Sequence, residues 1–176
     1  MTLRSTATTL EGRVLIAAVC VRQGCIAQGV ELKEAGNELY KKAQHIAACK
    51  KYREGISLFE RKRGRCLVEG DDLERCKVVM VPLHLNLAAC QLELKDYKMA
   101  LKNCRRVIEL DPANPKARFR AGKALWEQGE AEEAQSVMEG IKLKDRSKEV
   151  RVLLDKAMKH ARAQHDKEKA LYAKTF

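Results

Sequence analysis

The feature that most constrains the fold of this chain is a repeat of 34 residues. The segment NLAACQLELKDYKMALKNCRRVIELDP, which begins at residue 86, aligns with RAGKALWEQGEAEEAQSVMEGIKLKDR, which begins at residue 120. Small residues recur at two fixed positions, where Ala88 matches Gly122 and Ala100 matches Ala134. A period of this length with small residues at fixed places indicates closely packed helix pairs, which must stack on one another to bury their apolar faces.

An earlier and more divergent copy precedes these two. EAGNELYKK (34–42) and KKYREGISLFERKR (50–63) have the character of its two helices, with Gly36 in the first small position. The distance from Gly36 to Ala88 is 52 residues, which exceeds the period of 34 by 18. We expect about seven of the extra residues in AQHIAAC (43–49), between the two helices, and about eleven in 64–80, before the third helix or extending into it.

The spacing of small and large residues resembles that of the tetratricopeptide repeat (TPR). The positions that carry the resemblance in the middle copy are Ala88, Gln91, Tyr97, Ala100, Val107 and Pro112. The resemblance implies an all-α fold, a right-handed superhelical array of three TPR helix pairs. We expect the repeats at about 29–63, 81–114 and 115–146. The presence of only 3 prolines and 10 glycines in 176 residues agrees with a helical chain.

A seventh helix is expected over 147–176, where Ser147 is a candidate cap. Val150, Leu154 and Ala157 begin an apolar stripe at helical spacing, so this helix would cover the end of the array. Residues 1–28 form an unassigned N-terminal extension. Its TTLE segment (8–11) favours a short capped helix, although three arginines and one acid also give it a faint likeness to an organelle presequence.

Polar residues recur on the first helix of each pair, the helix that would line the concave groove. Lys33 and Asn37 lie four residues apart, as do Lys116 and Arg120, and Asn86 lies on the helix between them. These side chains are hydrogen-bond donors, and three of them are cationic, so together they suit the oxygens of carboxylates.

These five residues also resemble the two-carboxylate clamp of TPR co-chaperones. In that family, Lys-xxx-Asn, Asn and Lys-xxx-Arg on three successive first helices hold the acidic Glu-Glu-Val-Asp tail of heat shock protein 90 or 70. The resemblance implies a peptide-binding clamp of Lys33, Asn37, Asn86, Lys116 and Arg120. Tyr40 and Ala89 either line the groove beside a valine of the peptide or pack in the core, and the sequence favours neither.

The long insertion and the segments LHLNLAACQLELKDYKMAL and KEKALYAKTF resemble the TPR domains of large immunophilins, the FKBP-type and cyclophilin-type peptidyl-prolyl isomerases. The sequence shows no nucleophile elbow, phosphate-binding glycine loop or metal-ligand cluster. We therefore expect no catalysis, cofactor or metal in this chain, which is either a fragment of an isomerase or a small co-chaperone. The alternatives are an adaptor for another acidic C-terminal peptide and a basic nucleic-acid-binding helical protein.

The net charge of +11 predicts an acidic partner. Nucleic acid is disfavoured because aromatic residues make up only 5% of the chain, and the basic cluster ERKRGR (60–65) is better explained as a solvated helix end. The basic C-terminal helix suggests calmodulin or another acidic partner as an alternative to simple capping. The longest apolar run, VLIAAVCV, is too short to span a membrane. Seven cysteines without metal-ligand spacing favour free thiols and a cytoplasmic location.

Overall fold

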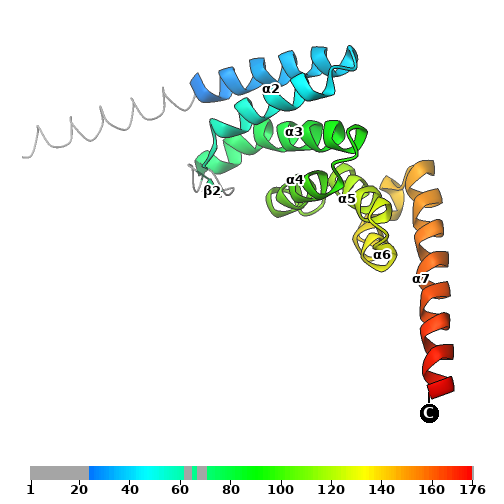
Figure 1. The fold of residues 1–176 in the computed structure, drawn as a ribbon. Helices are drawn as coiled ribbons and strands as arrows, with labels where there is room; N and C mark the ends of the chain where they lie inside the picture. The colour runs from blue at the N-terminus through cyan, green and yellow to red at the C-terminus, as the bar shows by residue number, and fades with distance from the viewer. Residues whose placement is uncertain (1–23, 62–64, 67–70, 176) are drawn as a thin grey trace, which may run out of the picture.

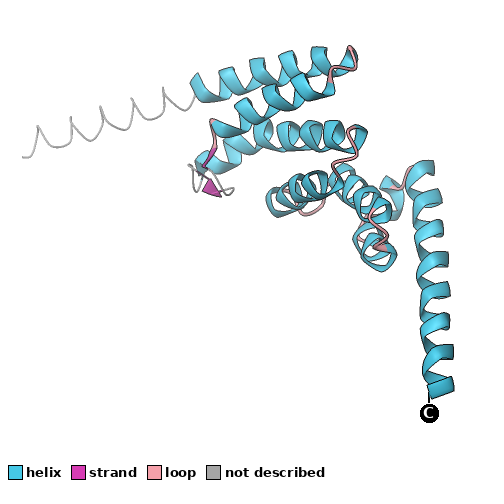
Figure 2. Ribbon diagram, viewed as in Figure 1, coloured by secondary structure: helices cyan, strands magenta, loops and turns pink. Residues whose placement is uncertain are grey.

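The computed structural model describes residues 24–61, 65–66 and 71–175, and over these residues the chain is a stacked array of helices (Figure 1). The all-helical class predicted from the repeat is confirmed, with one short hairpin added (Figure 2). The elements are a first helix over 24–41, α2 (His45–Ser57), β1 (Glu60–Arg61), β2 (Arg65–Cys66), α3 (Asp71–Glu93), α4 (Tyr97–Leu110), α5 (Pro115–Glu127), α6 (Ala131–Glu139), a 3-10 turn η1 (Leu143–Asp145) and α7 (Lys148–Thr175).

The helix starts follow local capping rules. The Asp96 side chain accepts a hydrogen bond from the Met99 backbone N–H at 3.3 Å, and Asn114 caps α5 in the same way, with Pro115 following it. The Ser147 hydroxyl accepts from the Val150 N–H at 3.4 Å, which confirms the cap predicted for the last helix. These caps set the boundaries of the second helix pair (α3 with α4), the third (α5 with α6) and α7.

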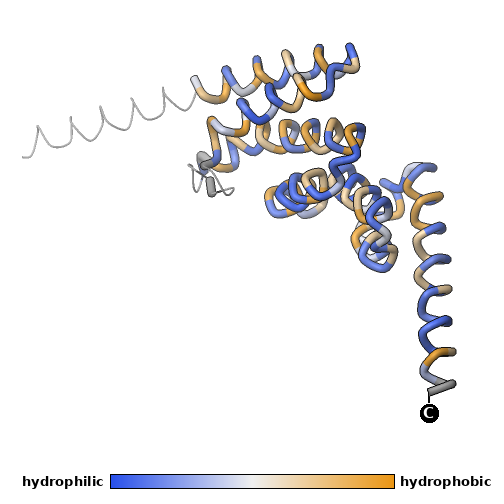
Figure 3. Tube along the Cα trace, in the orientation of Figure 1, coloured by the Kyte–Doolittle hydropathy of each residue, from blue (hydrophilic) through white to orange (hydrophobic). Residues whose placement is uncertain are grey.

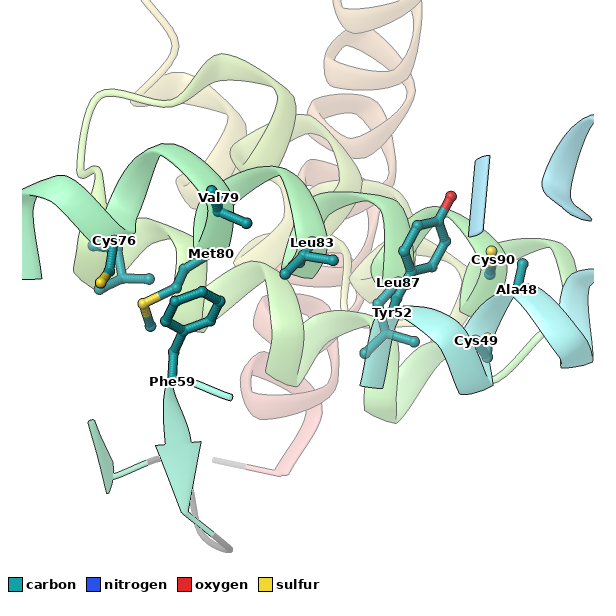
Figure 4. Packing of buried hydrophobic residues seen from close by; sticks show 11 residues of the cluster. Ala48, Cys49, Tyr52, Phe59, Cys76, Val79, Met80, Leu83, Leu87 and Cys90 are labelled. Atoms are coloured by element: carbon teal, nitrogen blue, oxygen red, sulfur yellow. The ribbon is translucent and has the colours of Figure 1, made fainter. Parts of the chain in front are cut away.

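Five clusters of buried apolar residues hold the described array together, and three smaller ones join α3, α4 and α5. Hydrophobic bands recur along the helices (Figure 3). The largest cluster joins the first helix, α2 and α3 around Tyr52, Phe59 and Met80 (Figure 4). The second joins α5, α6 and α7 around Leu125, Met138 and Leu154. Small residues lie where helices touch, as the repeat predicted: a Cβ atom placed on Gly122 would overlap the Met138 side chain.

The helices of the first repeat differ from their sequence-based description in two ways. The expected insertion AQHIAAC lies largely within α2, and only residues 42–44 connect the two helices, because Ala48 and Cys49 continue the buried face of that helix. The first helix already includes 24–28, which we assigned to the extension, because Cys25 and Ile26 pack against the core. The rest of the extension, including its TTLE cap, lies outside the described residues.

The basic cluster 60–65 is not a helix end, as the sequence had suggested. Helix α2 ends at Ser57, and Glu60–Arg61 pairs antiparallel with Arg65–Cys66. Glu60 is 8% exposed and accepts a hydrogen bond from the Arg106 Nε at 2.7 Å. The buried ion pair between Glu60 and Arg106 of α4 therefore holds this segment against the array.

Helix α7 packs against α6 through its first half only. Val150, Leu154 and Ala157 are buried, and the Trp126 ring makes an edge-to-face contact with His160 at 5.7 Å. Side chains from 162 to 172 are exposed, and this part of the helix projects from the array (Figure 1). Among the described helices, none has the length and apolar character that crossing a membrane requires.

Candidate functional site

A cavity of about 430 Å³ lies where the first helices of the three pairs face one another. We call it the groove cavity. It is lined by Glu34, Asn37, Glu38, Tyr40, Lys41, Tyr52, Asn86, Ala89 and Arg120. Five residues singled out from the sequence, Asn37, Asn86, Arg120, Tyr40 and Ala89, therefore lie around one space.

The side chains of Asn37 and Asn86 are in direct contact, although the inserted residues lie between them in the sequence. Asn86 Nδ2 donates a hydrogen bond to Asn37 Oδ1 at 2.8 Å. The Tyr52 hydroxyl donates to the same oxygen, also at 2.8 Å. The 18 extra residues therefore leave the first helix in register with α3. Helix α2 has 13 residues and α4 has 14, so the extra residues lie between the end of α2 and the first turns of the longer α3, away from Asn37 and Asn86.

Tyr52 holds this arrangement from behind. Its ring packs on Gly36, where a Cβ atom would overlap it, so the small residue lets α2 approach the first helix closely. Tyr52 is 1% exposed, and burial raises its pKa to about 12, so its hydroxyl remains a donor throughout the physiological pH range. The Tyr52 hydroxyl and Asn86 Nδ2 both donate to Asn37 Oδ1, so the Asn37 amide nitrogen is left to donate elsewhere.

Arg120 supplies the positive charge of the cavity. Its Nη1 donates to the Leu85 carbonyl at 2.7 Å, which fixes the guanidinium against α3. Burial lowers the pKa of Arg120 from its ordinary value of 12.5, yet an arginine at neutral pH keeps its charge. None of the ion pairs formed among the described residues includes Arg120. A half-buried guanidinium facing a cavity without a carboxylate partner suits an anionic ligand.

Tyr40 and Ala89 both contribute to the cavity wall. The Tyr40 ring makes an edge-to-face contact with His45 at 5.0 Å, and its pKa is raised, first by burial and then by the negative charge of Glu93. The ring therefore serves both as part of the wall and as packing for the start of α2. These two residues therefore add an apolar part to a wall that is otherwise mainly polar.

Lys33 and Lys116 do not line the cavity. Lys33 is half-buried on the first helix, one turn before Asn37, and Lys116 is exposed, one turn before Arg120. Their positions are those that the spacing predicts, but their side chains lie outside the space that the other residues enclose. Whether they bind a peptide stays a prediction.

The sequence did not point to Tyr52, Lys41 or the two acids as lining residues. Lys41 lies one turn after Asn37 and pairs with Glu38 at 2.7 Å, and the hydrogen bond to Lys41 lowers the pKa of Glu38. The signal for Tyr52 was present, because an aromatic residue facing the small Gly36 is typical of the close helix contact. The rim of the cavity is therefore mixed in charge, and its interior is cationic and rich in hydrogen-bond donors.

Comparison with known proteins supports this fold and indicates the class of repeat that forms it. A family model described as tetratricopeptide repeat matches residues 91–157. The described structure superposes on the C-terminal TPR-containing domain of a Plasmodium falciparum FK506-binding protein with a TM-score of 0.72, at 24% identity, over 82% of this chain and 95% of that one. Residues 91–157 therefore match the tetratricopeptide repeat, and the described structure has the fold of a TPR domain.

Its relatives include an immunophilin and a TPR domain solved with a bound peptide. The chain is 29% identical to peptidyl-prolyl cis-trans isomerase FKBP4 of Bos taurus, over 86% of this chain and 32% of that protein, so it spans about a third of that relative's length and is homologous to its TPR region. The second TPR of Spaghetti (RPAP3), bound to the HSP90 peptide SRMEEVD, shares 26% identity with a TM-score of 0.54, over 68% of this chain and 93% of that one.

Proposed function

We propose that this chain is a co-chaperone module whose groove cavity binds the acidic Glu-Glu-Val-Asp tail of heat shock protein 90 or 70 through a two-carboxylate clamp. The observation that carries the proposal is the half-buried Arg120 guanidinium, fixed on the Leu85 carbonyl and turned to a cavity that it shares with Asn37 and Asn86. The similarity to a TPR domain that was solved with an Hsp90 peptide supports it.

The roles within the cavity follow from charge and geometry. Arg120 is the strong donor, suited to one carboxylate through paired N–H groups. The free amide hydrogens of Asn37 and Asn86 provide neutral donors for the second carboxylate. Lys33 and Lys116 flank these residues by one helical turn, and a flexible lysine side chain can reach inward once an anion is bound. Tyr40 and Ala89 form the apolar wall against which a valine side chain packs.

The proposal extends to the longer protein and its location. Because the relative matched over most of this chain is an FKBP-type isomerase, the chain would be the TPR part of such an immunophilin, with catalysis belonging to another domain. Such a protein would act in the cytoplasm. The observations that support the proposal all concern the groove cavity, so it does not include calmodulin as a partner.

The test of the clamp is a calorimetric titration with the peptide Met-Glu-Glu-Val-Asp as the free acid and as the C-terminal amide. The free acid should bind, whereas the amide should bind at least tenfold more weakly because one carboxylate is lost. Arg120→Ala should cost about 1.5–3 kcal/mol of binding free energy, the range for a charged hydrogen bond, which is roughly a 10- to 150-fold loss. Lys123→Ala removes an exposed cation on the same helix and serves as the matched control. Equal binding of acid and amide would contradict the proposal.

The flanking lysines need a separate measurement. Lys33→Ala and Lys116→Ala should each weaken binding of the free acid by about 1.5–3 kcal/mol if the side chains close on the bound carboxylates. Both variants should keep the thermal stability of the parent chain, because neither side chain takes part in the side-chain hydrogen bonds or ion pairs of the described residues. Unchanged affinity in both would restrict the clamp to Asn37, Asn86 and Arg120.

A further inference from the structure

A second pocket lies between the end of α2, the middle of α3 and the face of α4. Its volume is about 810 Å³, and it shares no lining residue with the groove cavity. We call it the α2–α4 pocket. The proposed peptide clamp makes no use of it, yet its lining has a distinct and consistent character.

The rim of this pocket is basic. Arg53 comes from α2, and Lys98, Lys102 and Arg105 come from α4, all with exposed side chains. Two acids also line the pocket, but Arg106 bonds to both of them, to Glu60 at 2.7 Å and to Glu109 at 2.8 Å. Arg105 makes only an exposed contact with Glu133 at 3.5 Å. Arg53, Lys98 and Lys102 appear in none of the ion pairs formed within the described structure, so the rim presents an unbalanced positive field.

The wall between these cations is apolar. Ile56, Leu87, Met99 and Leu101 all line the pocket. Met99 is 38% exposed, and it lies on α4 between the exposed Lys98 and Lys102. An exposed methionine is an adaptable contact for a partner's apolar side chain, because its thioether is unbranched and polarizable. The pocket therefore offers one apolar contact surface surrounded by positive charge.

One buried ring nitrogen in the lining makes no hydrogen bond. Asn103 donates through Nδ2 to Gln91 and to the Met99 carbonyl, so its oxygen accepts from His84 Nδ1, which lies 2.9 Å away. The other ring nitrogen of His84, Nε2, is buried and makes no hydrogen bond, although it lies 3.5 Å from a Glu60 oxygen. His84 is 4% exposed and lines the pocket. A buried ring nitrogen whose contact with Glu60 is this long can also accommodate a polar backbone group of a ligand.

We propose that the α2–α4 pocket binds an acidic peptide segment that carries an apolar anchor residue between its acids. The acids would lie against Arg53, Lys98 and Lys102, and the anchor would pack on Met99 and Leu87. No terminal carboxylate is required, so the segment can be internal to a partner protein. This gives the chain a second interaction surface, independent of the groove cavity and its clamp.

The lining favours a peptide over nucleic acid. Binding of single strands relies on aromatic side chains that stack on bases, and no tyrosine, tryptophan or phenylalanine is among the residues that line this pocket. A peptide with spaced acids and an apolar side chain satisfies both the rim and the wall.

The probe is the blocked peptide acetyl-Glu-Glu-Leu-Glu-Glu-amide, titrated into the full chain and followed by ¹H–¹⁵N NMR and calorimetry. Shifts should centre on Leu87, Met99 and Lys102 and leave Asn37 and Asn86 unmoved. Lys98→Glu with Lys102→Glu should weaken binding at least tenfold, and Met99→Ser at least threefold. The matched control, Lys142→Glu with Lys144→Glu, makes the same change of net charge at exposed residues outside the pocket and should change affinity by less than twofold.

Several outcomes would overturn the proposal. An equal loss in the control pair would indicate attraction to net charge alone. Equal binding of acetyl-Glu-Glu-Gly-Glu-Glu-amide would show that the peptide needs no apolar anchor. Chemical-shift changes centred on the groove cavity would show that the peptide binds there instead. Tighter, Lys98- and Lys102-dependent binding of a single-stranded oligothymidylate would make the pocket a nucleic-acid surface. Titrating free-acid Met-Glu-Glu-Val-Asp into the same variants separates this outcome from the clamp, because its binding should be retained.

Discussion

At the scale of single residues, the Asn37 side-chain oxygen is the point where three helices meet. It accepts hydrogen bonds from Tyr52 on α2 and Asn86 on α3. Tyr52→Phe removes one of these donors without changing the shape of the core. We expect the free energy of unfolding to fall by about 1 kcal/mol, the scale of one buried hydrogen bond, and chemical denaturation measures it. Affinity for the Glu-Glu-Val-Asp peptide should also fall, because Asn37 is then less firmly oriented.

Tyr97→Phe is the matched control for this change. The Tyr97 hydroxyl donates to Glu127 at 3.4 Å, a long bond on the surface, so its loss should leave stability and peptide affinity unchanged within error. If the two variants behave alike, the Tyr52 bond contributes nothing specific to the groove. If Tyr52→Phe lowers stability but not affinity, Asn37 does not depend on it for binding.

The residues of the groove cavity show which parts of a site a sequence can predict. Asn37, Asn86 and Arg120 were predictable because a helical period fixes which face a residue occupies, and the repeat fixes how faces align. Lys33 and Lys116 share those faces, but a long side chain on a helix can lie in solvent as easily as in a groove, and backbone period does not decide between them. Tyr52 was harder to predict as a lining residue, because it belongs to the second helix of its pair, behind the groove.

At the scale of elements, α7 acts as the cap of the array through its first three turns. Leu154 is 7% exposed and packs in the cluster around Met138, whereas Val152 is 47% exposed on the opposite side. Leu154→Ala should lower the free energy of unfolding by about 2–4 kcal/mol, because it leaves a cavity beneath α7. Val152→Ala removes a similar group from the surface and should change it by less than about 0.5 kcal/mol. Thermal denaturation of both variants distinguishes a cap from a loosely attached helix.

The elements also show where local sequence is ambiguous. AQHIAAC was assigned between two helices because it exceeds the repeat length, but alanine and cysteine suit a helix interior, and Ala48 and Cys49 face the core beside Cys90 (Figure 4). The burial of these small residues against the core explains why the segment is helical. The cluster 60–65 was assigned to a helix end because of its charge. The partner that anchors Glu60, Arg106, lies 46 residues later in the sequence, where no local pattern indicates it.

At the scale of the whole molecule, Glu60 connects the end of the first repeat to the second. It contacts Arg106 on α4 at 2.7 Å and lies 3.5 Å from His84 on α3, so one carboxylate joins the hairpin to two helices. Burial alone would raise the pKa of Glu60, but the interactions with His84 and Arg106 outweigh it, and the pKa lies below its ordinary value of 4.5. A carboxyl with a lowered folded-state pKa stabilises the fold above its unfolded pKa and loses this contribution as the pH falls through the folded pKa.

The array should therefore lose stability in acid, between about pH 4.5 and the lower folded pKa of Glu60. Glu60→Gln should reduce the slope of unfolding free energy against pH in that window. At pH 7 it should cost about 1–3 kcal/mol, because the half-buried Arg106 guanidinium then loses the negative charge with which it pairs. Glu38→Gln, which breaks a pair with Lys41, is the control and should change the acid limb much less, because both side chains are exposed and solvent screens the pair. Denaturation measured from pH 7 to pH 3 tests the link, and parallel curves for Glu60→Gln and the parent chain would show that the ion pair does not couple the first repeat to the second.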